Sequence, residues 1–347
     1  MARLVWGLMG DSRGHLTRAH IMAGELSRHD ILFVGGGCVD ELRERGHRVL
    51  NVPMPGTILK DNHVAGFATA SLFLRLALGK GQVLKQLASE LESFKPDLAV
   101  SDYEFFLPRA ARMLGLPCVG FGHQHVLTHC AGTLPPGQPM NRLLTVSSIR
   151  LFFSVPNRYF VTSFFPARAK QADTVVLPPV LRADVPVLSP WRGEHVLAYL
   201  RAGMPSGLLA ALATTGREIR VYGQGAKSPE GNLKFFTLNR EHFLEDLAGC
   251  AYVVSSGGHN LVSEALWLGK PVLAAPVAMF YEQYVNAWHL RGLGFGDFLL
   301  GETGAKATVE GFEAQLEARR EAVLSGGLKL GNRLAAQCIE RMLVGDA

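Results

Sequence analysis

The sequence has little of what marks several protein classes. Its 347 residues include only five cysteines, which are scattered and form no Cys-x-x-Cys pair. Neither a disulfide framework nor a zinc ribbon fits that pattern, so we expect a reducing compartment. Low-complexity tracts, short-period repeats and an Asp-x-Asp pair are also missing. The most apolar stretch, residues 64–79, carries Arg75 and falls short of a membrane-spanning helix.

A secretory signal is missing as well. Only seven residues, 4–10, form the apolar run before Asp11 and Arg13, whereas a signal peptide needs a longer run and a small-residue cleavage site. We therefore expect a soluble protein of the cytoplasm. Residues 64–79 could still touch the inner face of a membrane as a peripheral contact.

The charge is unevenly distributed. Residues 1–180 hold 19 Lys and Arg against 13 Asp and Glu, a balance of +6, whereas residues 181–347 hold 16 against 17, a balance of −1. A basic first half suits an anionic substrate or an anionic membrane surface, and solvated surface charge explains it equally well. Nucleic acid is not expected as a partner because the basic residues are dispersed and no aromatic–basic motif accompanies them.

What the sequence does contain is a repeated alternation of strand and helix patterns. Apolar or β-branched runs predict strands at residues 4–9, 31–34, 47–52, 97–101, 118–121, 196–200, 219–222, 252–255 and 272–275. Helical spacing occurs between them, at residues 19–26, 39–45, 82–94, 108–114, 206–214, 243–247 and 261–268. The alternation predicts an α/β protein with two doubly wound, Rossmann-like domains that face each other across a cleft.

A proline-rich stretch divides the two series. Pro178, Pro179, Pro186 and Pro190 make helix or central strand unfavourable there. We place an N-terminal domain at residues 1–178, a linker at 179–194 and a C-terminal domain at 195–347. The last helix of the chain could pack back on the N-terminal domain.

The turn after the first strand is the first candidate site. It reads Gly10-Asp11-Ser12-Arg13-Gly14-His15, and its glycines would let backbone N–H groups approach an anion or a sugar. The spacing is not Gly-x-Gly-x-x-Gly, and a tight strand-to-helix connection explains it equally well. If the turn is functional, His15 is suited to act as a general base, because imidazole exchanges protons near neutral pH.

Polar residues follow the next two strands of the first series. Asp102 would orient His15 and stabilise its protonated form, or it would cap the following helix. His123 and His125 follow residues 118–121 and lack a carboxylate or cysteine partner for a metal. We therefore expect these two histidines to form hydrogen bonds with substrate or at the seam between the domains, and we expect no metal.

The strongest candidate begins at residue 255. A Ser-Ser-Gly-Gly-His turn leads into a helix that starts at about Asn260, whose free N–H groups and dipole would hold a pyrophosphate. Glu264, one turn into this helix, would accept both hydroxyls of a ribose; otherwise it is a helix-N-terminal acid that contributes about 0.3–1 kcal/mol. Glu282 and Gln283 follow the next strand, and their side chains suit sugar hydroxyls.

Residues 255–296 resemble the donor-binding signature of glycosyltransferases with two Rossmann-like domains, the GT-B fold. They carry the pattern S-x-G-x-x-x-x-S-E-A-L-x-L-G-K-P-V-L-x-x-P, followed by E-Q-x-x-N-A. The similarity is to the branch that includes UDP-sugar transferases and the peptidoglycan GlcNAc transferase. Residues 243–250 and 199–203 resemble its base-binding segment and its interdomain turn near the diphosphate. The first turn and the Ser101-Asp102 turn also match, so the resemblance spans nearly the whole chain.

The resemblance implies an inverting, metal-independent hexosyltransferase without a cofactor, acting on a UDP-linked hexose or N-acetylhexosamine. His15 and Asp102 would be the base and its partner in an N-terminal acceptor-binding domain. The other residues that the resemblance and the turns together suggest are, on the donor side, Arg201, Gly257, Gly258, His259, Asn260, Glu264, Glu282 and Gln283, and, on the acceptor side, Gly14, His123 and His125. Departures at residues 255–259 and 279–281 leave the phosphate contacts and the sugar open.

Two further questions stay open at this stage. Residues 66–87, apolar with Arg75, Lys80 and Lys85, would form either a surface for a lipid-linked acceptor of a cell-envelope pathway or a helix pair packed on the N-terminal domain. A nonhydrolysing UDP-sugar epimerase and a nucleotide-sugar-binding protein without catalysis are the alternatives to a transferase. The epimerase would need further acid/base carboxylates in the cleft, and a nicotinamide dehydrogenase is a more distant possibility.

Overall fold

The computed structural model describes residues 1–11, 13–54, 59–60, 63–64, 66–200, 205–301 and 303–345; for residues 59–60, 63–64, 66–78 and 206 it describes the backbone alone. Arg201, which we expected near the diphosphate, lies outside the described residues. No helix in the described ranges is long and apolar enough to cross a membrane.

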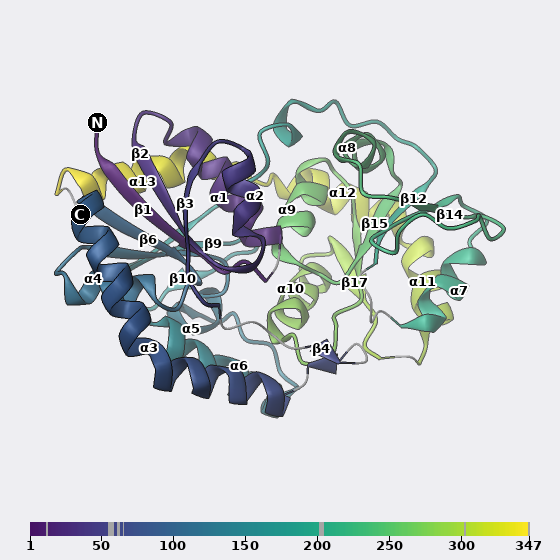
Figure 1. Cartoon of the computed structure of the whole chain (residues 1–347). Coiled ribbons are helices and arrows are strands. Elements are labelled where there is room, and N and C mark those ends of the chain that lie inside the picture. The colour runs from purple at the N-terminus through teal and green to yellow at the C-terminus, as the bar shows by residue number, and fades with distance from the viewer. Residues whose placement is uncertain are drawn as a thin grey trace.

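Two parallel sheets form the frame of the molecule (Figure 1). The first contains, in spatial order, β3 (Arg48–Asn51), β2 (Asp30–Gly35), β1 (Arg3–Leu8), β6 (Leu98–Asp102), β7 (Cys118–Gly122), β9 (Arg158–Thr162) and β11 (Thr174–Leu177). The second contains β14 (Leu233–Phe236), β13 (Ile219–Tyr222), β12 (Val196–Tyr199), β15 (Tyr252–Ser255), β16 (Val272–Ala274) and β17 (Gly296–Phe298). This architecture confirms the predicted pair of Rossmann-like domains.

Helices cover both faces of each sheet because the strands are apolar on both faces. In β1, Leu4, Trp6 and Leu8 pack with one core cluster while Val5 packs with the other. The helices that follow strands of the first series are α1 (Arg13–Glu25), α2 (Asp40–Glu44), α3 (Gly66–Phe94), α4 (Leu107–Met113), α5 (Val126–His129) and α6 (Pro139–Ser148), the last continued by the π-helical turn η2 (Ile149–Phe153). The second series has α7 (Ser206–Ala213), α8 (Arg240–Gly249), α9 (His259–Trp267), α10 (Tyr281–Gly292), α11 (Ala305–Ala314) and α12 (Leu316–Gly326).

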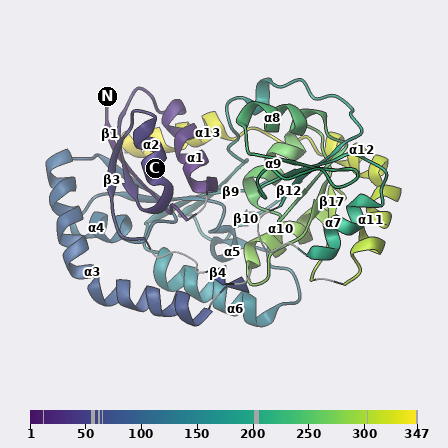
Figure 2. The same cartoon turned by 45° about the vertical axis from the view of Figure 1, so that its right-hand side comes forward.

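The last helix, α13 (Asn332–Leu343), returns to the first sheet. It packs on α1, and Ile339 belongs to the same core cluster as Leu4 and Trp6. The Asn332 side chain donates to the carbonyl of Leu181 (2.8 Å) and accepts from its N–H (2.9 Å), which ties the start of α13 to the segment between the sheets. Both ends of the chain therefore lie on the same half of the molecule (Figures 1 and 2).

The segment between β11 and β12 contains only the 3-10 turn η3 (Val185–Val187) in the way of regular structure. We keep the boundaries at residues 178 and 195 as a proposal. Two short antiparallel pairs, β4 (Leu59–Lys60) with β5 (His63–Val64) and β8 (Cys130–Ala131) with β10 (Arg168–Ala169), lie outside the main sheets.

One helix prediction was wrong. We expected a separate helix at residues 82–94, and a helix pair was one of the two alternatives for residues 66–87, but α3 is one helix of 29 residues. Gly79 and Gly81 cost about 1 kcal/mol each relative to Ala in a helix interior, which weakens a helix without ending it. No Pro or left-handed residue occurs between Gly81 and Phe94, and leucines of the C-terminal half, such as Leu87 and Leu91, anchor the helix in the core.

Strand order places the candidate residues. In each sheet the order reverses beside the first strand, between β1 and β6 and between β12 and β15. Ligands of open α/β sheets bind outside the carboxyl ends of the strands at such a reversal. Leu8 pairs with Asp102 in the first sheet and Tyr199 with Ser255 in the second, so the turns after these four strands lie at the two reversal points.

Candidate active site

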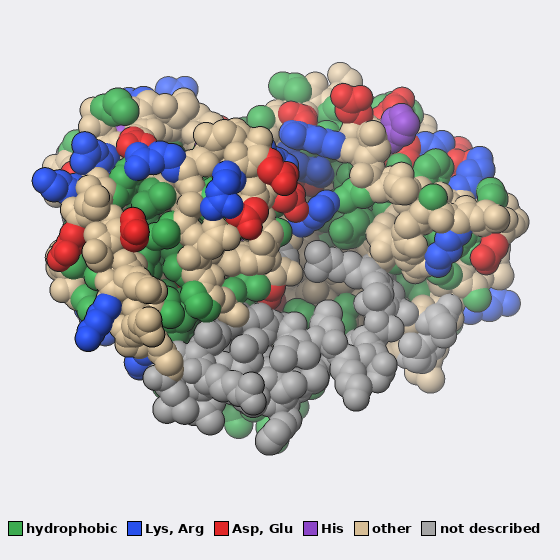
Figure 3. Space-filling model, in the orientation of Figure 1, with side chains coloured by type: hydrophobic (Ala, Val, Ile, Leu, Met, Phe, Trp, Pro, Cys, Tyr) green, Lys and Arg blue, Asp and Glu red, His purple; other side chains and the backbone are tan. Residues whose placement is uncertain are grey.

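A cavity of about 1290 Å³ lies between the two halves of the molecule. Its walls include the turn after β1, the ends of β6 and β7, α6 with η2, the start of α9 and the segment before α10. In the space-filling view the surface is hollowed between the halves, and Lys and Arg side chains gather along part of that seam (Figure 3). The reversal points of both sheets therefore open into one cavity.

His15 and Asp102 meet at the floor of this cavity. His15 Nδ1 lies 2.8 Å from Asp102 Oδ1, and the amide nitrogen of Gln124 lies 3.4 Å from His15 Nε2. A carboxylate can only accept, so Nδ1–H donates to Asp102 and Nε2 carries the lone pair. Arg18 Nη2, which lies 3.1 Å from Nδ1, donates to the carboxylate and not to the ring. This tautomer leaves a lone pair on the cavity side of the ring.

Arg18 completes the cluster, three residues after His15 on the same face of α1. It donates from Nη2 to Asp102 Oδ1 (2.7 Å) and from Nε to Oδ2 (2.8 Å), and all three side chains are buried. Burial alone would raise the pKa of Asp102, but Arg18 and then His15 outweigh it and hold that pKa below its usual value. Asp102 is therefore ionised at neutral pH.

Two residues beside the cluster, Gly122 and Tyr103, have unusual backbone conformations. Gly122 has φ +131°, and a Cβ there would stand 2.9 Å from Asp102 Oδ1 and 3.1 Å from Arg18 Nη2. Tyr103, next to Asp102, adopts φ +62°, a left-handed conformation that is unfavourable for an aromatic residue. Backbone strain of this kind often accompanies functional sites.

Asp102 does not cap the next helix. α4 begins at Leu107, five residues further on, and the carboxylate that accepts from the N–H of Leu107 belongs to Glu104. Burial raises the pKa of Glu104 to about 7, although the backbone N–H groups at the start of α4 oppose the shift.

The start of α9 is open toward the cavity. Gly258 precedes the helix, and no carbonyl or side chain of the described residues accepts from the N–H groups of His259, Asn260 or Leu261. Ser256, Gly258 and these three residues line the cavity. The first turn of a helix presents unsatisfied donors and a partial positive charge, so this end can receive an anion.

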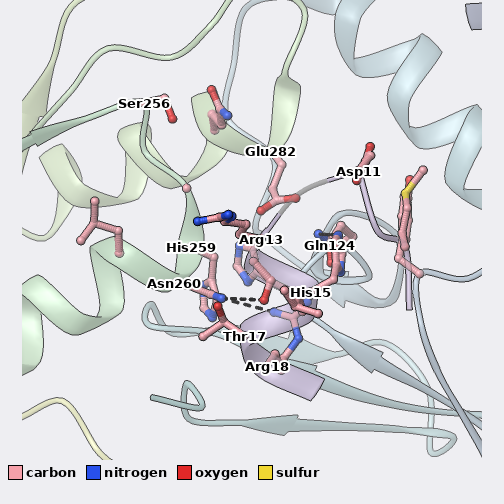
Figure 4. Close-up of a pocket in the computed structure, with 18 of the residues that line it drawn as sticks. Asp11, Arg13, His15, Thr17, Arg18, Gln124, Ser256, His259, Asn260 and Glu282 are labelled. Carbon is pink, nitrogen blue, oxygen red and sulfur yellow. Dashed lines mark hydrogen bonds between the residues drawn. The ribbon is translucent and has the colours of Figure 1, made fainter. Parts of the chain in front are cut away.

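Asn260 bridges the two halves. Its side chain donates to the carbonyl of Gly14 (2.9 Å), and its Oδ1 lies 3.4 Å from Arg18 Nη1 (Figure 4). Gly14 thus contacts the second half directly. The contact holds the start of α9 beside the His15 cluster.

Glu264 has a partner that the sequence did not reveal. Arg182, from the segment between the sheets, donates from Nε to Oε1 (2.7 Å) and from Nη2 to Oε2 (2.5 Å). Both residues line the cavity. Burial would lower the pKa of Arg182, but the Glu264 carboxylate outweighs it and raises that pKa. A fork of this kind fixes the plane of the carboxylate and leaves further lone pairs on each oxygen.

Glu282 and Gln283 begin α10 and line the same cavity. The carboxylate of Glu282 points into it toward Arg13 (Figure 4). Gln283 Oε1 accepts from the N–H of Val277 (3.0 Å), so its amide group is held in place while its nitrogen stays available.

The two histidines that follow β7, His123 and His125, lie in different surroundings. His123 lines the cavity wall and contacts Asn286 of α10, so it lies at the seam between the halves. His125 lies in the interior against Tyr159 and is not among the cavity-lining residues. Burial, and then His129, lowers the pKa of His125 to about 3, so it is neutral. Gly257 carries the backbone turn before α9, and its carbonyl accepts from Asn286 (3.0 Å).

One wing of the cavity is apolar. Tyr103 stacks on Phe153 (3.8 Å between ring centroids) and lies parallel to the His15 ring at 6.2 Å. Ile149 and Leu144 extend this wall along η2 and α6. Flat, apolar surface beside the imidazole suits an acceptor with an apolar portion.

Arg18 and Arg182 are the two residues that sequence reasoning missed. Arg18 had a signal, since a position three residues after His15 lies on the same helical face. Arg182 had none, because its partner is 82 residues away and no pattern links the two positions. Among the described residues no group of three or more His, Cys, Asp and Glu side chains is arranged to hold a metal ion.

Comparisons with known proteins place this architecture. The model of glycosyl transferase family 1 matches residues 2–316. Spinosyn forosaminyltransferase SpnP has a similar structure (16% identity, 99% of each chain covered, TM-score 0.67). MurG from Acinetobacter baumannii is similar at 15% identity over 98% of this chain and 100% of its own, with TM-score 0.62. SsfS6 from Streptomyces sp. SF2575, complexed with thymidine diphosphate, is similar at 17% identity over 98% of this chain and 100% of its own, with TM-score 0.64.

At these identities the structures show a shared fold, and the family match carries the classification. No curated protein matches the sequence. Among the activities that the sequence left open, the family supports transfer over epimerisation, oxidoreduction and binding without catalysis. The chain belongs to glycosyl transferase family 1 and is a glycosyltransferase of the GT-B fold.

Proposed function

We propose that this glycosyltransferase moves a sugar from a nucleoside diphosphate donor to an acceptor hydroxyl, with inversion and without a metal ion. The observation that carries the proposal is the placement of His15, oriented by Asp102, beside the open start of α9 in one cavity. A base and an anion site that line the same cavity suit a direct displacement at the anomeric carbon.

His15 is the proposed general base. Its Nε2 lone pair takes the proton of the acceptor hydroxyl while the hydroxyl oxygen forms a bond to the anomeric carbon. The bond from that carbon to the diphosphate breaks, and the diphosphate leaves with the electron pair. Asp102 stabilises the imidazolium that forms, and Arg18 keeps Asp102 ionised and correctly oriented.

The N–H groups of His259, Asn260 and Leu261 are the proposed binding site for the departing diphosphate. Preorganised donors and the helix dipole stabilise negative charge as it develops, which is the part that a metal ion plays elsewhere. Gly257 and Gly258 shape the turn that exposes these groups. Arg201 would add a cation here by the resemblance stated above.

Glu264 is proposed to bind the ribose, with Arg182 as the residue that positions its carboxylate. Tyr199 and Phe243 line the same end of the cavity and provide apolar contact for the nucleobase of the donor. Glu282 and Gln283 would contact the transferred sugar. We propose a uridine nucleotide by resemblance to the UDP-sugar branch; two structural neighbours were solved with thymidine diphosphate.

The acceptor side supports a membrane-associated substrate. Residues 105–172 carry seven Lys and Arg and no Asp or Glu. On α6 and η2 within this segment, Leu143 and Leu151 are 60% and 69% exposed. Apolar side chains beside basic ones favour contact with an anionic lipid surface, and the apolar wing of the cavity lies next to this face. We therefore propose a lipid-linked acceptor and a peripheral membrane contact.

A thermal-shift screen with UDP, GDP and dTDP tests the donor side. A ligand that binds only the folded chain raises its stability by mass action, by about 2.7 kcal/mol at a concentration 100-fold above its Kd. We expect stabilisation by UDP and loss of that effect in Glu264→Gln. Stabilisation by none of the three nucleotides would overturn the proposal.

A further inference from the structure

His123 is a fully buried imidazole with an oxygen atom at each of its ring nitrogens. Nδ1 lies 2.6 Å from the carbonyl oxygen of Thr162 in β9, and Nε2 lies 2.7 Å from Oδ1 of Asn286 in α10. A carbonyl oxygen can only accept a hydrogen bond. Thr162 therefore requires a proton on Nδ1.

The orientation of Asn286 decides the other nitrogen. Its Nδ2 donates to the carbonyl of Gly257 (3.0 Å), which can only accept, so its Oδ1 must face His123. A neutral imidazole carries one donor and one acceptor, and either tautomer would set a lone pair against an oxygen. If the Asn286 amide were turned, its nitrogen could donate to His123 Nε2, but its oxygen would then face the carbonyl oxygen of Gly257. Only an imidazolium, which donates from both nitrogens, satisfies all three contacts.

The groups packed around His123 do not neutralise this charge. His259 of α9 stacks on it at 3.9 Å, and burial first, then His123 and Arg18, lowers the pKa of His259 well below its ordinary value. Burial also lowers the pKa of His289 of α10, whose Nε2 lies 3.0 Å from the carbonyl of Thr133. Phe164 and Phe165 cover the remaining sides. No carboxylate of the described residues forms an ion pair with His123.

A buried charge without a counterion is unfavourable, so its counterion is expected from a ligand. The ligand site that lies against His123 is the start of α9, because His259 is the first residue of that helix. A diphosphate bound there would stand one side-chain layer from the imidazolium. The two buried nitrogens of His259, which have no described partner, lie between them.

We propose that His123 is held as an imidazolium that balances the charge of the donor diphosphate, so that donor binding and protonation of His123 are coupled. The inference rests on the proposed function, since it assumes a diphosphate at α9. His123 acts through the turn at Gly257 and the His259 ring, and it is a positioning residue.

The test is nitrogen NMR of histidine-labelled protein with saturating UDP, with His123→Gln to assign the His123 signals. We expect both ring nitrogens of His123 to be protonated at about pH 7 in the complex, and this protonation to persist to higher pH with UDP than without it. A neutral His123 in the UDP complex would overturn the inference. Failure of UDP to bind at all would instead overturn the proposed function.

Affinity measurements give a second, independent readout. Protonation coupled to binding makes the affinity for UDP fall as the pH rises, and calorimetry in buffers of different ionisation enthalpy should record proton uptake. Ionisation of the terminal phosphate of UDP, with a pKa of about 6, would act in the opposite direction. His123→Gln, whose amide cannot take up a proton, should bind UDP without this proton uptake and without the part of the pH dependence that comes from His123. Unchanged proton uptake in this variant would contradict the coupling.

Discussion

Removal of the His15 imidazole is the perturbation that most sharply separates chemistry from binding. In His15→Ala the carboxylate of Asp102 keeps both hydrogen bonds from Arg18, at 2.7 and 2.8 Å, so no buried charge is left unpaired. The stability cost should be about 1–2 kcal/mol, that of a lost buried hydrogen bond and a small cavity. The variant is therefore expected to fold.

The effect on catalysis should be far larger. A positioned general base contributes about 10²–10⁴-fold to the rate, which corresponds to about 3–5 kcal/mol of transition-state stabilisation. Because the proposed donor contacts are the N–H groups of α9 and the Glu264 carboxylate and not the imidazole, the affinity for UDP should change by less than about threefold.

The assay is single-turnover transfer from a radiolabelled donor found by the nucleotide screen, with UDP affinity measured in parallel. His242→Ala, the same substitution at an exposed position on α8, is the matched control and should keep the wild-type rate. A transfer rate in His15→Ala within about threefold of wild type would refute the assignment of the base. Equal losses of transfer and of UDP affinity would refute the claim that His15 serves catalysis and not donor binding.

Three further changes test other parts of the account. Arg182→Ala should raise KM for the donor about tenfold with a smaller effect on kcat. Arg182→Lys should restore little of the lost affinity, because a lysine cannot form the two-pronged hydrogen bond to Glu264. Tighter UDP binding in Arg182→Ala would instead mean that Arg182 competes with the ribose. Burial raises the pKa of Glu104 from 4.5 to about 7, so the folded chain retains a proton that the unfolded chain releases, and stability should fall as the pH rises between these values. In Glu104→Gln this loss of about 3 kcal/mol should disappear. Urea unfolding should therefore show a larger difference in unfolding free energy between the variant and wild type at about pH 8 than at about pH 5. An equal difference at both pH values would contradict the burial argument. Leu143→Glu with Leu151→Glu should abolish sedimentation with anionic vesicles while leaving the thermal shift by UDP intact, and unchanged sedimentation would exclude the α6 surface as the membrane contact.

The predictable part of the fold lies where a pattern is local. Apolar runs such as residues 98–102 are buried on both faces, and that alone indicates a parallel sheet covered on both sides. The long α3 was misjudged because Gly79 and Gly81 look like a boundary, whereas distant leucine contacts decide that the helix continues. The strands β9 and β11 were not predicted, although both carry the apolar and β-branched residues that are typical of strands.

The candidate site divides in the same way. The contact between His15 and Asp102 could be predicted because each follows an apolar strand, and strand order then brings Leu8 and Asp102 side by side. The cap interpretation for Asp102 failed because four residues, 103–106, separate it from α4, and the first of them, Tyr103, has a left-handed conformation. The forks from Arg18 and Arg182 depend on tertiary placement, which no spacing in the sequence encodes for Arg182.

The most direct measurement is a crystal structure of the protein with UDP. The account predicts that diphosphate oxygens accept hydrogen bonds from the N–H groups of His259, Asn260 and Leu261, with the ribose hydroxyls on Glu264. A nucleotide bound elsewhere, or a diphosphate that leaves the start of α9 empty, would contradict it.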